Sequence, residues 1–131
     1  MSDKYLEHVA FGSTELSTQL MFAATLINST LLADFMRNVV LDAKRMFRES
    51  LDVGDWESFW YERSRIFPEL SQMSESSTYK ISQVASKVIA DAGYIESTRS
   101  KTIQNVYLLP EVRDALVESD RDDIISAMEM H

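Results

Sequence analysis

Residues 74–110 constrain the fold most, because a helical pattern there is followed by two short β-favouring runs and a proline. Ser74 or Ser76 is a suitable N-cap for the helix. The apolar residues that follow recur at the spacing of one buried helix face, and they are Ile81, Val84, Ala85, Val88, Ile89 and Ala92. Gly93 comes where a left-handed residue usually ends a helix. The pattern therefore predicts a helix that ends at residue 92.

The residues after this helix predict a small β-hairpin. Residues 94–95 and 103–109 favour β-structure, and the polar residues 96–102 separate them. Pro110 ends the second run and suits the first turn of another helix. A helix followed by a two-stranded wing is the arrangement of winged helix-turn-helix domains, so this segment raises a nucleic-acid hypothesis.

The charges along the chain support that hypothesis modestly. Residues 76–109 carry four basic and two acidic side chains, whereas residues 1–75 carry seven basic and twelve acidic ones and residues 110–131 carry two basic and seven acidic ones. The window is thus the positive part of a chain with a net charge of −8. A solvated helix face and a polar turn account for the same charges without a ligand, and this alternative stays open.

The basic residues of the window are the predicted phosphate contacts. Lys80 and Lys87 are two helical turns apart and share a polar face, while Arg99 and Lys101 fall at the tip of the predicted wing. We expect this helix to enter the major groove, with mainly backbone contacts and weak sequence preference.

Hydroxyl groups at the start of the same helix extend the predicted interface. Ser76, Ser77 and Thr78 are placed to hydrogen-bond a phosphate at the helix N-terminus. Tyr79 has two interpretations, a DNA contact or burial against Trp60, of which burial is slightly favoured.

Length and composition predict one compact domain over residues 1–131, with a helical part at 1–70 and a winged-helix-like part at 71–131. The fold class is mainly α, a helical bundle with one small β-hairpin in its C-terminal unit. The chain has no cysteine, no apolar run long enough for a membrane span, and an N-terminus unlike a signal peptide. We expect a cytoplasmic protein that does not engage a membrane.

Other helices are predicted from apolar periodicity and capping residues. One begins near residues 12–14 and breaks at 28–30, and a longer one covers 31–47. Asp55 is the expected N-cap of a helix over 56–67, whose aromatic residues we expect in the core and which Pro68 stops. Helices at 111–118 and 124–130 follow, the last with a start resembling a capping box at Asp120 and Asp123.

The sequence offers no catalytic or metal-binding constellation. His8 and His131 lie near opposite termini, and no phosphate-loop, dinucleotide, nucleophile-elbow or zinc-protease motif occurs. The acidic run at 120–123 lacks the glycine and distal glutamate of a calcium loop. We therefore expect no enzyme activity, no cofactor, no metal and no small-molecule substrate.

Four stretches in this order resemble the BrxA family, the small accessory proteins of BREX phage-resistance systems. They are Gly12-Ser13-Thr14-Glu15-Leu16 leading to Leu31-Leu32-Ala33-Asp34-Phe35, then Asp55-Trp56-Glu57-Ser58-Phe59, then Glu75-Ser76-Ser77-Thr78-Tyr79-Lys80 leading to Ala90-Asp91-Ala92-Gly93-Tyr94-Ile95, and finally Leu108-Leu109-Pro110-Glu111-Val112. The resemblance covers about residues 10–118, and it rests on the order and spacing of the stretches together.

The resemblance implies a non-enzymatic, double-stranded-DNA-binding helical protein that acts beside other BREX proteins. Family members have a further helical N-terminal region, so the chain resembles an N-terminally short member or a fragment. A second hypothesis is a protein-interaction adaptor whose acidic first and last segments dock on a larger defence component without binding DNA. A net charge of −8 and a pI near 4.7 argue against strong non-specific DNA binding, which needs many cations, so any DNA contact must be local, shared with a partner or completed by residues outside this chain.

Overall fold

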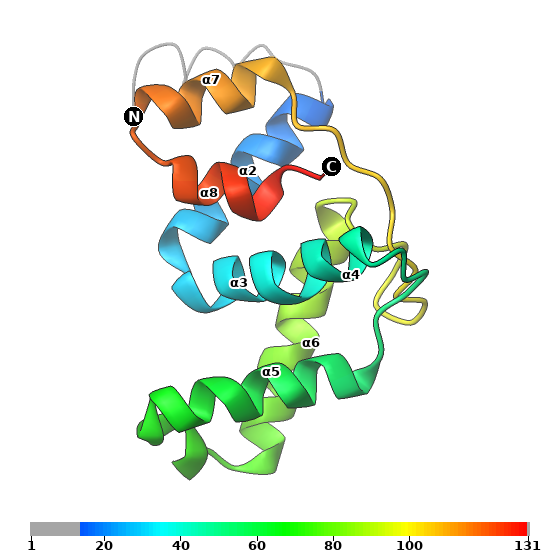
Figure 1. Ribbon diagram of the computed structural model, residues 1–131, viewed down its shortest axis with the longest axis vertical. Helices are drawn as coiled ribbons and strands as arrows, with labels where there is room; N and C mark the ends of the chain where they lie inside the picture. Colours follow the sequence, from blue (N-terminus) through cyan, green and yellow to red (C-terminus); the bar gives the residue numbers. More distant parts are fainter. Residues whose placement is uncertain (1–13, 131) are drawn as a thin grey trace.

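The computed structural model describes residues 14–130, and the chain there is built almost wholly of helices (Figure 1). In chain order they are α2 (Thr14–Asn28), α3 (Thr30–Phe35), a π-helical turn (Met36–Val40), α4 (Leu41–Arg45), α5 (Val53–Ile66), a 3₁₀ turn (Pro68–Gln72), α6 (Glu75–Asp91), α7 (Pro110–Glu118) and α8 (Asp122–Met128). α7 and α8 lie at one end of the molecule, and α5 with the start of α6 lies at the other. The prediction of a mainly helical chain is confirmed.

A break at residues 28–30 separates α2 from the next helical segment, as the sequence predicts. The Ser29 hydroxyl accepts a hydrogen bond from the Leu32 N–H at 3.2 Å, which caps α3. α2 and the helical stretch Thr30–Arg45 meet at 109°. No single helix between residues 14 and 130 is long and apolar enough to cross a membrane, although these two pass that test together as a bent pair.

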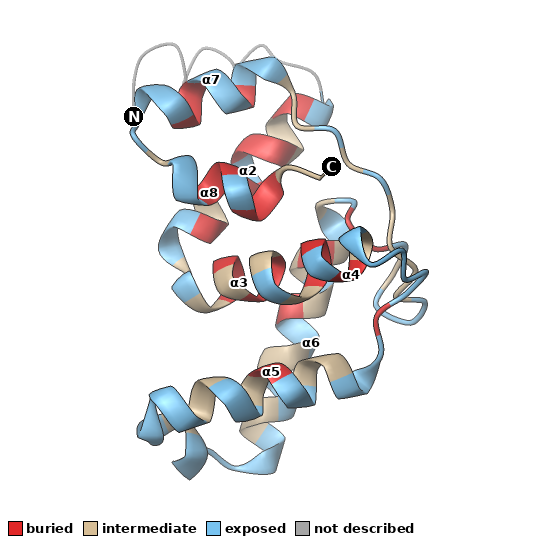
Figure 2. Ribbon diagram, viewed as in Figure 1, coloured by how far each residue is buried: buried red, intermediate tan, exposed pale blue. Residues whose placement is uncertain are grey.

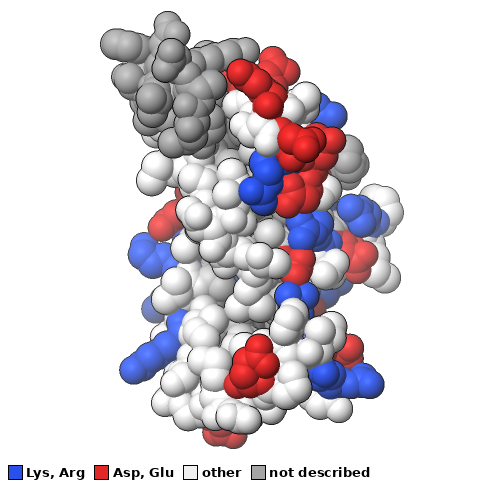
Figure 3. Space-filling model, turned by 90° about the vertical axis from the view of Figure 1, so that its left-hand side faces the viewer, with Lys and Arg blue, Asp and Glu red and all other residues white. Residues whose placement is uncertain are grey.

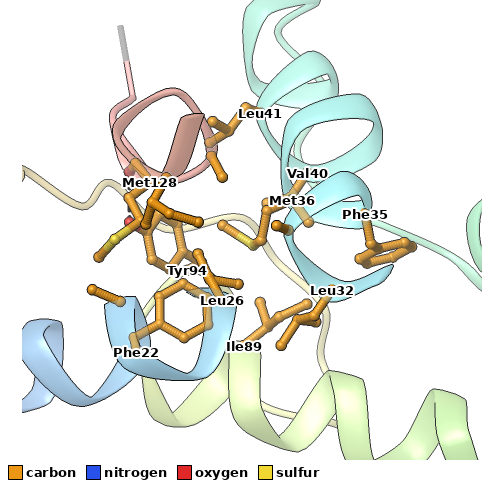
Figure 4. Close-up of a cluster of buried hydrophobic side chains, with 14 of the residues drawn as sticks. Phe22, Leu26, Leu32, Phe35, Met36, Val40, Leu41, Ile89, Tyr94 and Met128 are labelled. Carbon is orange, nitrogen blue, oxygen red and sulfur yellow. Dashed lines mark hydrogen bonds between the residues drawn. The ribbon is translucent and has the colours of Figure 1, made fainter. Parts of the chain in front are cut away.

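The hydrophobic core forms where α2, α3, the π turn, α7 and α8 meet the C-terminal part of α6, and Tyr94 lies within it (Figures 2 and 4). The Tyr94 ring packs against Phe22 with 5.3 Å between ring centroids, and its hydroxyl donates to the Met128 carbonyl at 2.5 Å. Burial raises the pKa of the Tyr94 phenol, because a phenolate would be poorly solvated there. A residue outside every helix thus connects α2 with the end of α8.

Helix α6 begins and ends as the sequence predicts. Ser74 caps it by accepting from the Ser77 N–H at 3.1 Å, and Gly93 follows it with a φ of +92°. The predicted buried face is wrong at Val84, which is 64% exposed, whereas Ala85 and Ile89 are buried and Ile81 and Val88 are half-buried. The other core elements meet α6 near its C-terminal half, so apolar periodicity alone overstates the burial.

The predicted β-hairpin of a winged-helix unit is wrong. Between residues 14 and 130 no residue belongs to a β-strand, and two isolated antiparallel bridges stand in place of a wing. One joins Ile95 to Ile103, and the other joins Ser50 to Thr102. The loop 97–101 is therefore closed by a single bridge and its flanking hydrogen bond, from the Glu96 N–H to the Thr102 carbonyl, and not by two strands.

The predicted second strand does not continue because side chains, and not a neighbouring strand, bond the backbone of residues 106–109. The buried Gln19 side chain of α2 donates to the Tyr107 carbonyl and accepts from the Leu109 N–H, both at 2.9 Å. The Val106 N–H points to the Met130 sulfur at 3.4 Å. This segment consequently packs along the helices as irregular chain, because a side chain provides the hydrogen bonds that a neighbouring strand would have provided.

Two predicted helix starts are also corrected. Asp52, not Asp55, caps α5, and Asp55 occupies the third helical position of a reciprocal capping box with Asp52. Before α8 the N-cap position is Arg121, which makes no side-chain capping bond, and Asp120 instead has a left-handed φ of +58°. The stop at Pro68 is confirmed, since α5 ends at Ile66 and Phe67 follows as its C-cap.

Candidate nucleic-acid interface

The predicted hydroxyl contacts all lie in the first turn of α6. The Ser77 hydroxyl lies 3.0 Å from that of Ser74, and the Thr78 hydroxyl donates to the Ser74 carbonyl at 3.0 Å. The Ser76 hydroxyl lies 3.4 Å from that of Ser74. These groups complete the helix N-terminus, and they lie at the end of α6 farthest from the loop 97–101.

The four predicted basic contacts are divided between two places. Lys87 on α6, with Arg99 and Lys101 from the following loop, lines one cleft, and so does Thr78. Lys80 is exposed but is not among the residues that line it, and neither are Ser76 and Ser77. The structure therefore brings together four of the seven predicted residues, and it leaves Ser76, Ser77 and Lys80 near the start of α6.

The cleft lies between α5 and α6 and has a volume of about 1470 Å³. Its walls carry the aromatic residues Trp56, Trp60, Tyr61 and Tyr79. Trp56 and Trp60 stack with 5.7 Å between ring centroids and 28° between their planes. The cleft is thus an aromatic groove with hydroxyl and amide groups along α6, which suits a macromolecular partner better than a small polar substrate.

The aromatic helix differs from its predicted role. Phe59 is buried, and it packs edge-on against Phe35 at 5.1 Å, so the core prediction is confirmed for this residue. Trp60 is half-buried and Tyr61 is 65% exposed, so much of the helix faces the cleft. Tyr79 is 63% exposed, and its predicted burial against Trp60 is therefore wrong.

Charges around the cleft are mixed. Arg65 joins Lys87, Arg99 and Lys101, and the acidic residues on the same walls are Asp52, Glu57 and Glu75. Lys87 Nζ lies 3.4 Å from Asp91 Oδ2 at an exposed position, where such a pair is worth little in water. Lys101 Nζ donates to the Thr98 carbonyl at 3.1 Å. The cleft is only weakly positive, but it is more positive than the chain as a whole.

A second basic segment, which the sequence analysis did not select, lies beside the loop 97–101. The Leu51 N–H donates to the Lys101 carbonyl at 2.9 Å, and the Ile103 N–H donates to the Glu49 carbonyl at 2.8 Å. These bonds place the residues after α4 along the loop (Figure 1). The run Lys44-Arg45-Met46-Phe47-Arg48 was the sequence signal that could have identified it.

Arg48 and Asp55 form the best-defined ion pair of this second segment. Arg48 Nη1 and Nη2 donate to the two carboxylate oxygens of Asp55 at 2.7 and 2.8 Å. The guanidinium lowers the pKa of Asp55, chiefly through this hydrogen bond. Arg48 is thereby largely neutralised, whereas Lys44 and Arg45 have no ion-pair partner within residues 14–130.

We refer to Lys44, Arg45, Arg48, Arg99 and Lys101 as the basic end. The α7–α8 end of the molecule, in contrast, is acidic, as the red side chains near the top of Figure 3 show. Two arginines there are already paired, Arg113 with Glu129 and Arg121 with Asp123. The Arg121 hydrogen bond also lowers the pKa of Asp123. A polyanion would therefore be repelled from α7 and α8.

No group of three or more histidine, cysteine, aspartate or glutamate side chains within the described part of the chain is arranged to hold a metal ion. The features on which recognition can depend are accordingly the basic end and the aromatic cleft.

A family model described as BrxA matches residues 1–120. The chain belongs to the BrxA family. Its relatives include the "BREX protein BrxA" of Escherichia coli O9:H4 (strain HS), which is 36% identical over 121 residues, or 92% of this chain and 57% of that protein. Another "BREX protein BrxA", from Paramagnetospirillum magneticum (strain ATCC 700264 / AMB-1), is 28% identical over 130 residues, or 99% of this chain and 65% of that one.

A solved structure has the same fold. The crystal structure of an uncharacterized protein from Magnetospirillum magneticum matches with a TM-score of 0.89 and 28% sequence identity, over 98% of this chain and 68% of that chain. The chain spans 57% and 65% of the two curated relatives. The BrxA-type architecture seen here is therefore part of longer proteins in those organisms.

Proposed function

We propose that this BrxA-family protein is a non-enzymatic accessory component of a BREX phage-defence system, and that it binds double-stranded DNA through its basic end. The family match and the two relatives named as BREX proteins support the system. The observation that carries the DNA contact is the pairing of residues 49–51 with 101–103, which gathers cations from two separate segments on one side of an acidic molecule. In this proposal the protein acts in the cytoplasm, with DNA and other BREX proteins as partners.

The charge distribution limits how such a protein can bind DNA. With Arg48 held by Asp55, four cations of the basic end are available, which are Lys44, Arg45, Arg99 and Lys101. Neutralising about four phosphates gives a salt dependence with a slope of about −4 on a double-logarithmic plot. The contacts are to phosphates, and we expect weak sequence preference. The acidic α7–α8 end orients the protein so that the basic end faces the duplex.

The test is a binding titration with a labelled duplex at several salt concentrations. The double variant Arg99→Ala/Lys101→Ala should weaken binding at least tenfold at low salt and reduce the slope by about 2. The matched control Arg113→Ala/Arg121→Ala removes the same charge from the α7–α8 end, and it should weaken binding far less.

A quadruple variant tests the interface predicted from the sequence. Alanine at Lys80, Lys87, Arg99 and Lys101 should weaken binding somewhat more than alanine at Arg99 and Lys101 alone, because Lys87 lines the same cleft as these two residues, whereas Lys80 does not line it and should add little. Binding that is unaffected by all four substitutions would contradict the proposal.

The aromatic cleft favours a second candidate function, that of a protein-interaction adaptor. Exposed Tyr61, Tyr79 and Met73 line it, and aromatic residues and methionine are enriched in protein interfaces. The adaptor would dock on a larger BREX component. Co-purification with such a component, combined with no retardation of duplex DNA at low salt, would support the adaptor function over DNA binding.

A further inference from the structure

Three helices between residues 14 and 130 end with the same backbone turn, but the residue at its left-handed position differs. After α6 that residue is Gly93, with a φ of +92°, and after α7 it is Asp120, with a φ of +58°. After α4 it is Phe47, with a φ of +61°. Glycine adopts this conformation freely and aspartate tolerates it, whereas a bulky aromatic residue rarely does. Phe47 is therefore the unexpected member of the set.

The hydrogen bonds show that the three turns are equivalent. After α4, the Phe47 N–H donates to the Lys44 carbonyl at 3.1 Å, and the Arg48 N–H donates to the Ala43 carbonyl at 3.0 Å. After α7, the Asp120 and Arg121 N–H groups donate in the same pattern at 3.0 and 2.8 Å. The turn after α4 thus needs no property of phenylalanine, and glycine would form it with less strain.

The Phe47 side chain also contributes little to the core. It is 93% exposed, and the preceding Met46 is 68% exposed. No ring contact involves Phe47 within residues 14–130. A single exposed apolar residue is ordinary, but two adjacent ones on a strained turn form a projecting apolar tip that the fold does not use.

Charged groups surround this tip. Lys44 and Arg45 precede it in the last turn of α4, and Arg48 follows it. Arg99 and Lys101 belong to the loop that pairs with the residues immediately after it. The facing carboxylates are Asp42, Glu49, Asp52 and Asp55, and Arg48 contacts the last two. An apolar tip among cations matches the proteins that insert phenylalanine or methionine between base steps while cations hold the adjacent phosphates.

From this geometry we propose that Phe47, assisted by Met46, is a wedge that partly unstacks a base step of duplex DNA and bends the duplex. The inference rests on the proposed DNA-binding function and specifies the mode of contact. Wedges of this kind kink DNA by roughly 20–90°. Flexible pyrimidine–purine steps and mismatched pairs cost less to unstack, so a site containing one should be bound more tightly than a stiff A-tract.

The deciding variant is Phe47→Gly, because it removes the wedge without the risk of unfolding the protein. Its melting temperature should equal or exceed that of the wild type, since glycine suits a positive φ. Energy transfer between dyes at the two ends of a duplex measures bending. The wild type should shorten the end-to-end distance and prefer a duplex with a central mismatch by at least threefold. Phe47→Gly should lose both effects and keep the salt slope, because the cations remain.

Asp120→Gly is the matched control, since it makes the same change at the equivalent turn of α7. It should leave bending and mismatch preference unaltered. If Phe47→Gly bends DNA as the wild type does, the proposed wedge role of Phe47 is wrong, but the proposed DNA binding is unaffected. If the wild type does not bind duplex at low salt, the proposed function itself fails.

A lipid surface is the main competing partner, because aromatic and basic side chains also favour anionic membranes. Sedimentation with vesicles containing one-third phosphatidylserine distinguishes the two. One outcome would overturn the wedge proposal: the wild type binds vesicles but does not bend DNA, and Phe47→Gly abolishes the vesicle binding. The apolar tip would then be a membrane contact. Wild-type DNA bending with no vesicle binding supports the wedge proposal.

Discussion

The core around Tyr94 and the α5–α6 pair differ in how much of each helix is buried (Figure 2). α8 has seven residues and buries four of them, which are Ile124, Ile125, Ala127 and Met128. α6 has 17 residues and buries only Ala85 and Ile89, and α5 has 14 and buries only Phe59. The first region supplies most of the apolar burial that stabilises the fold. The second presents long helical faces and an aromatic cleft to solvent, which makes it available to partners.

Two substitutions on α6 test this contrast most strongly. Ile89→Ala removes a side chain that is 1% exposed, so we expect a loss of about 3 kcal/mol in the free energy of unfolding. Val84→Ala changes the same helix five residues earlier, where the side chain is exposed, and should cost less than about 0.5 kcal/mol. Urea unfolding at constant m-value measures both. Similar losses would mean that α6 is equally buried along its length.

The next largest effect should come from the buried amide that holds residues 107–109 against the core. Gln19→Ala leaves the Tyr107 carbonyl and the Leu109 N–H without their partner, and we expect a loss of about 2 kcal/mol. Faster hydrogen exchange at the Leu109 amide should accompany it. The exposed Gln83→Ala on α6 is the control, and it should leave stability within about 0.5 kcal/mol of the wild type. Slow exchange at Leu109 in the Gln19 variant would show that other groups hold this segment.

A smaller effect is expected at the start of α5, where Asp55 takes part in the capping box and the Arg48 pair. Asp55→Asn should cost about 1 kcal/mol at neutral pH. Because Arg48 lowers the pKa of Asp55 in the folded protein, the unfolded state binds more protons near pH 4 than the folded state does. The stabilisation is thus present above about pH 4, the ordinary range of an aspartate, and is lost as the pH falls below it.

Unfolding measured between pH 2 and pH 7 checks this assignment. The stability curves of the wild type and Asp55→Asn should converge at the acidic end. Glu57→Gln, an exposed change on the same helix, is the control and should change stability at neutral pH by less than about 0.5 kcal/mol. If the stability difference between the wild type and Asp55→Asn persists at pH 2, the loss comes from altered side-chain geometry and not from the missing charge.

The smallest effect on stability should occur inside the cleft, and it sharpens the contrast with the core. Tyr61→Ser replaces a side chain that is 65% exposed, and it should change stability by less than about 0.5 kcal/mol. If the cleft binds a BREX component, the same variant should lose co-purification with that component. A strongly destabilised Tyr61 variant would show that the cleft is part of the core.

The candidate site was only partly predictable from the sequence. Lys87, Arg99 and Lys101 do line one cleft, but Lys80 and the first-turn serines lie apart from it. Lys44 and Arg45 were missed, because they are more than fifty residues away from Arg99 in the chain. Their proximity depends on bridge pairing between residues 50 and 102, and no local pattern encodes such a pairing.

The sequence by itself determined the local boundaries of the helices. Ser29, Ser74, Gly93 and Pro68 act through their own side chains or backbone freedom, and each ends or begins a helix as expected. These effects span one or two turns, so nearby residues suffice to specify them.

Tertiary structure determined that residues 103–109 form irregular chain and not a strand. They have β propensity, and yet no strand forms. Ile103 and Gln104 donate to the carbonyls of Glu49 and Tyr94, whereas Gln19 from the other half of the chain bonds the backbone of Tyr107 and Leu109. It likewise decided which part of α6 is buried. β propensity and apolar periodicity describe what a segment can do, whereas hydrogen-bond partners and packing surfaces distant in sequence select what it does.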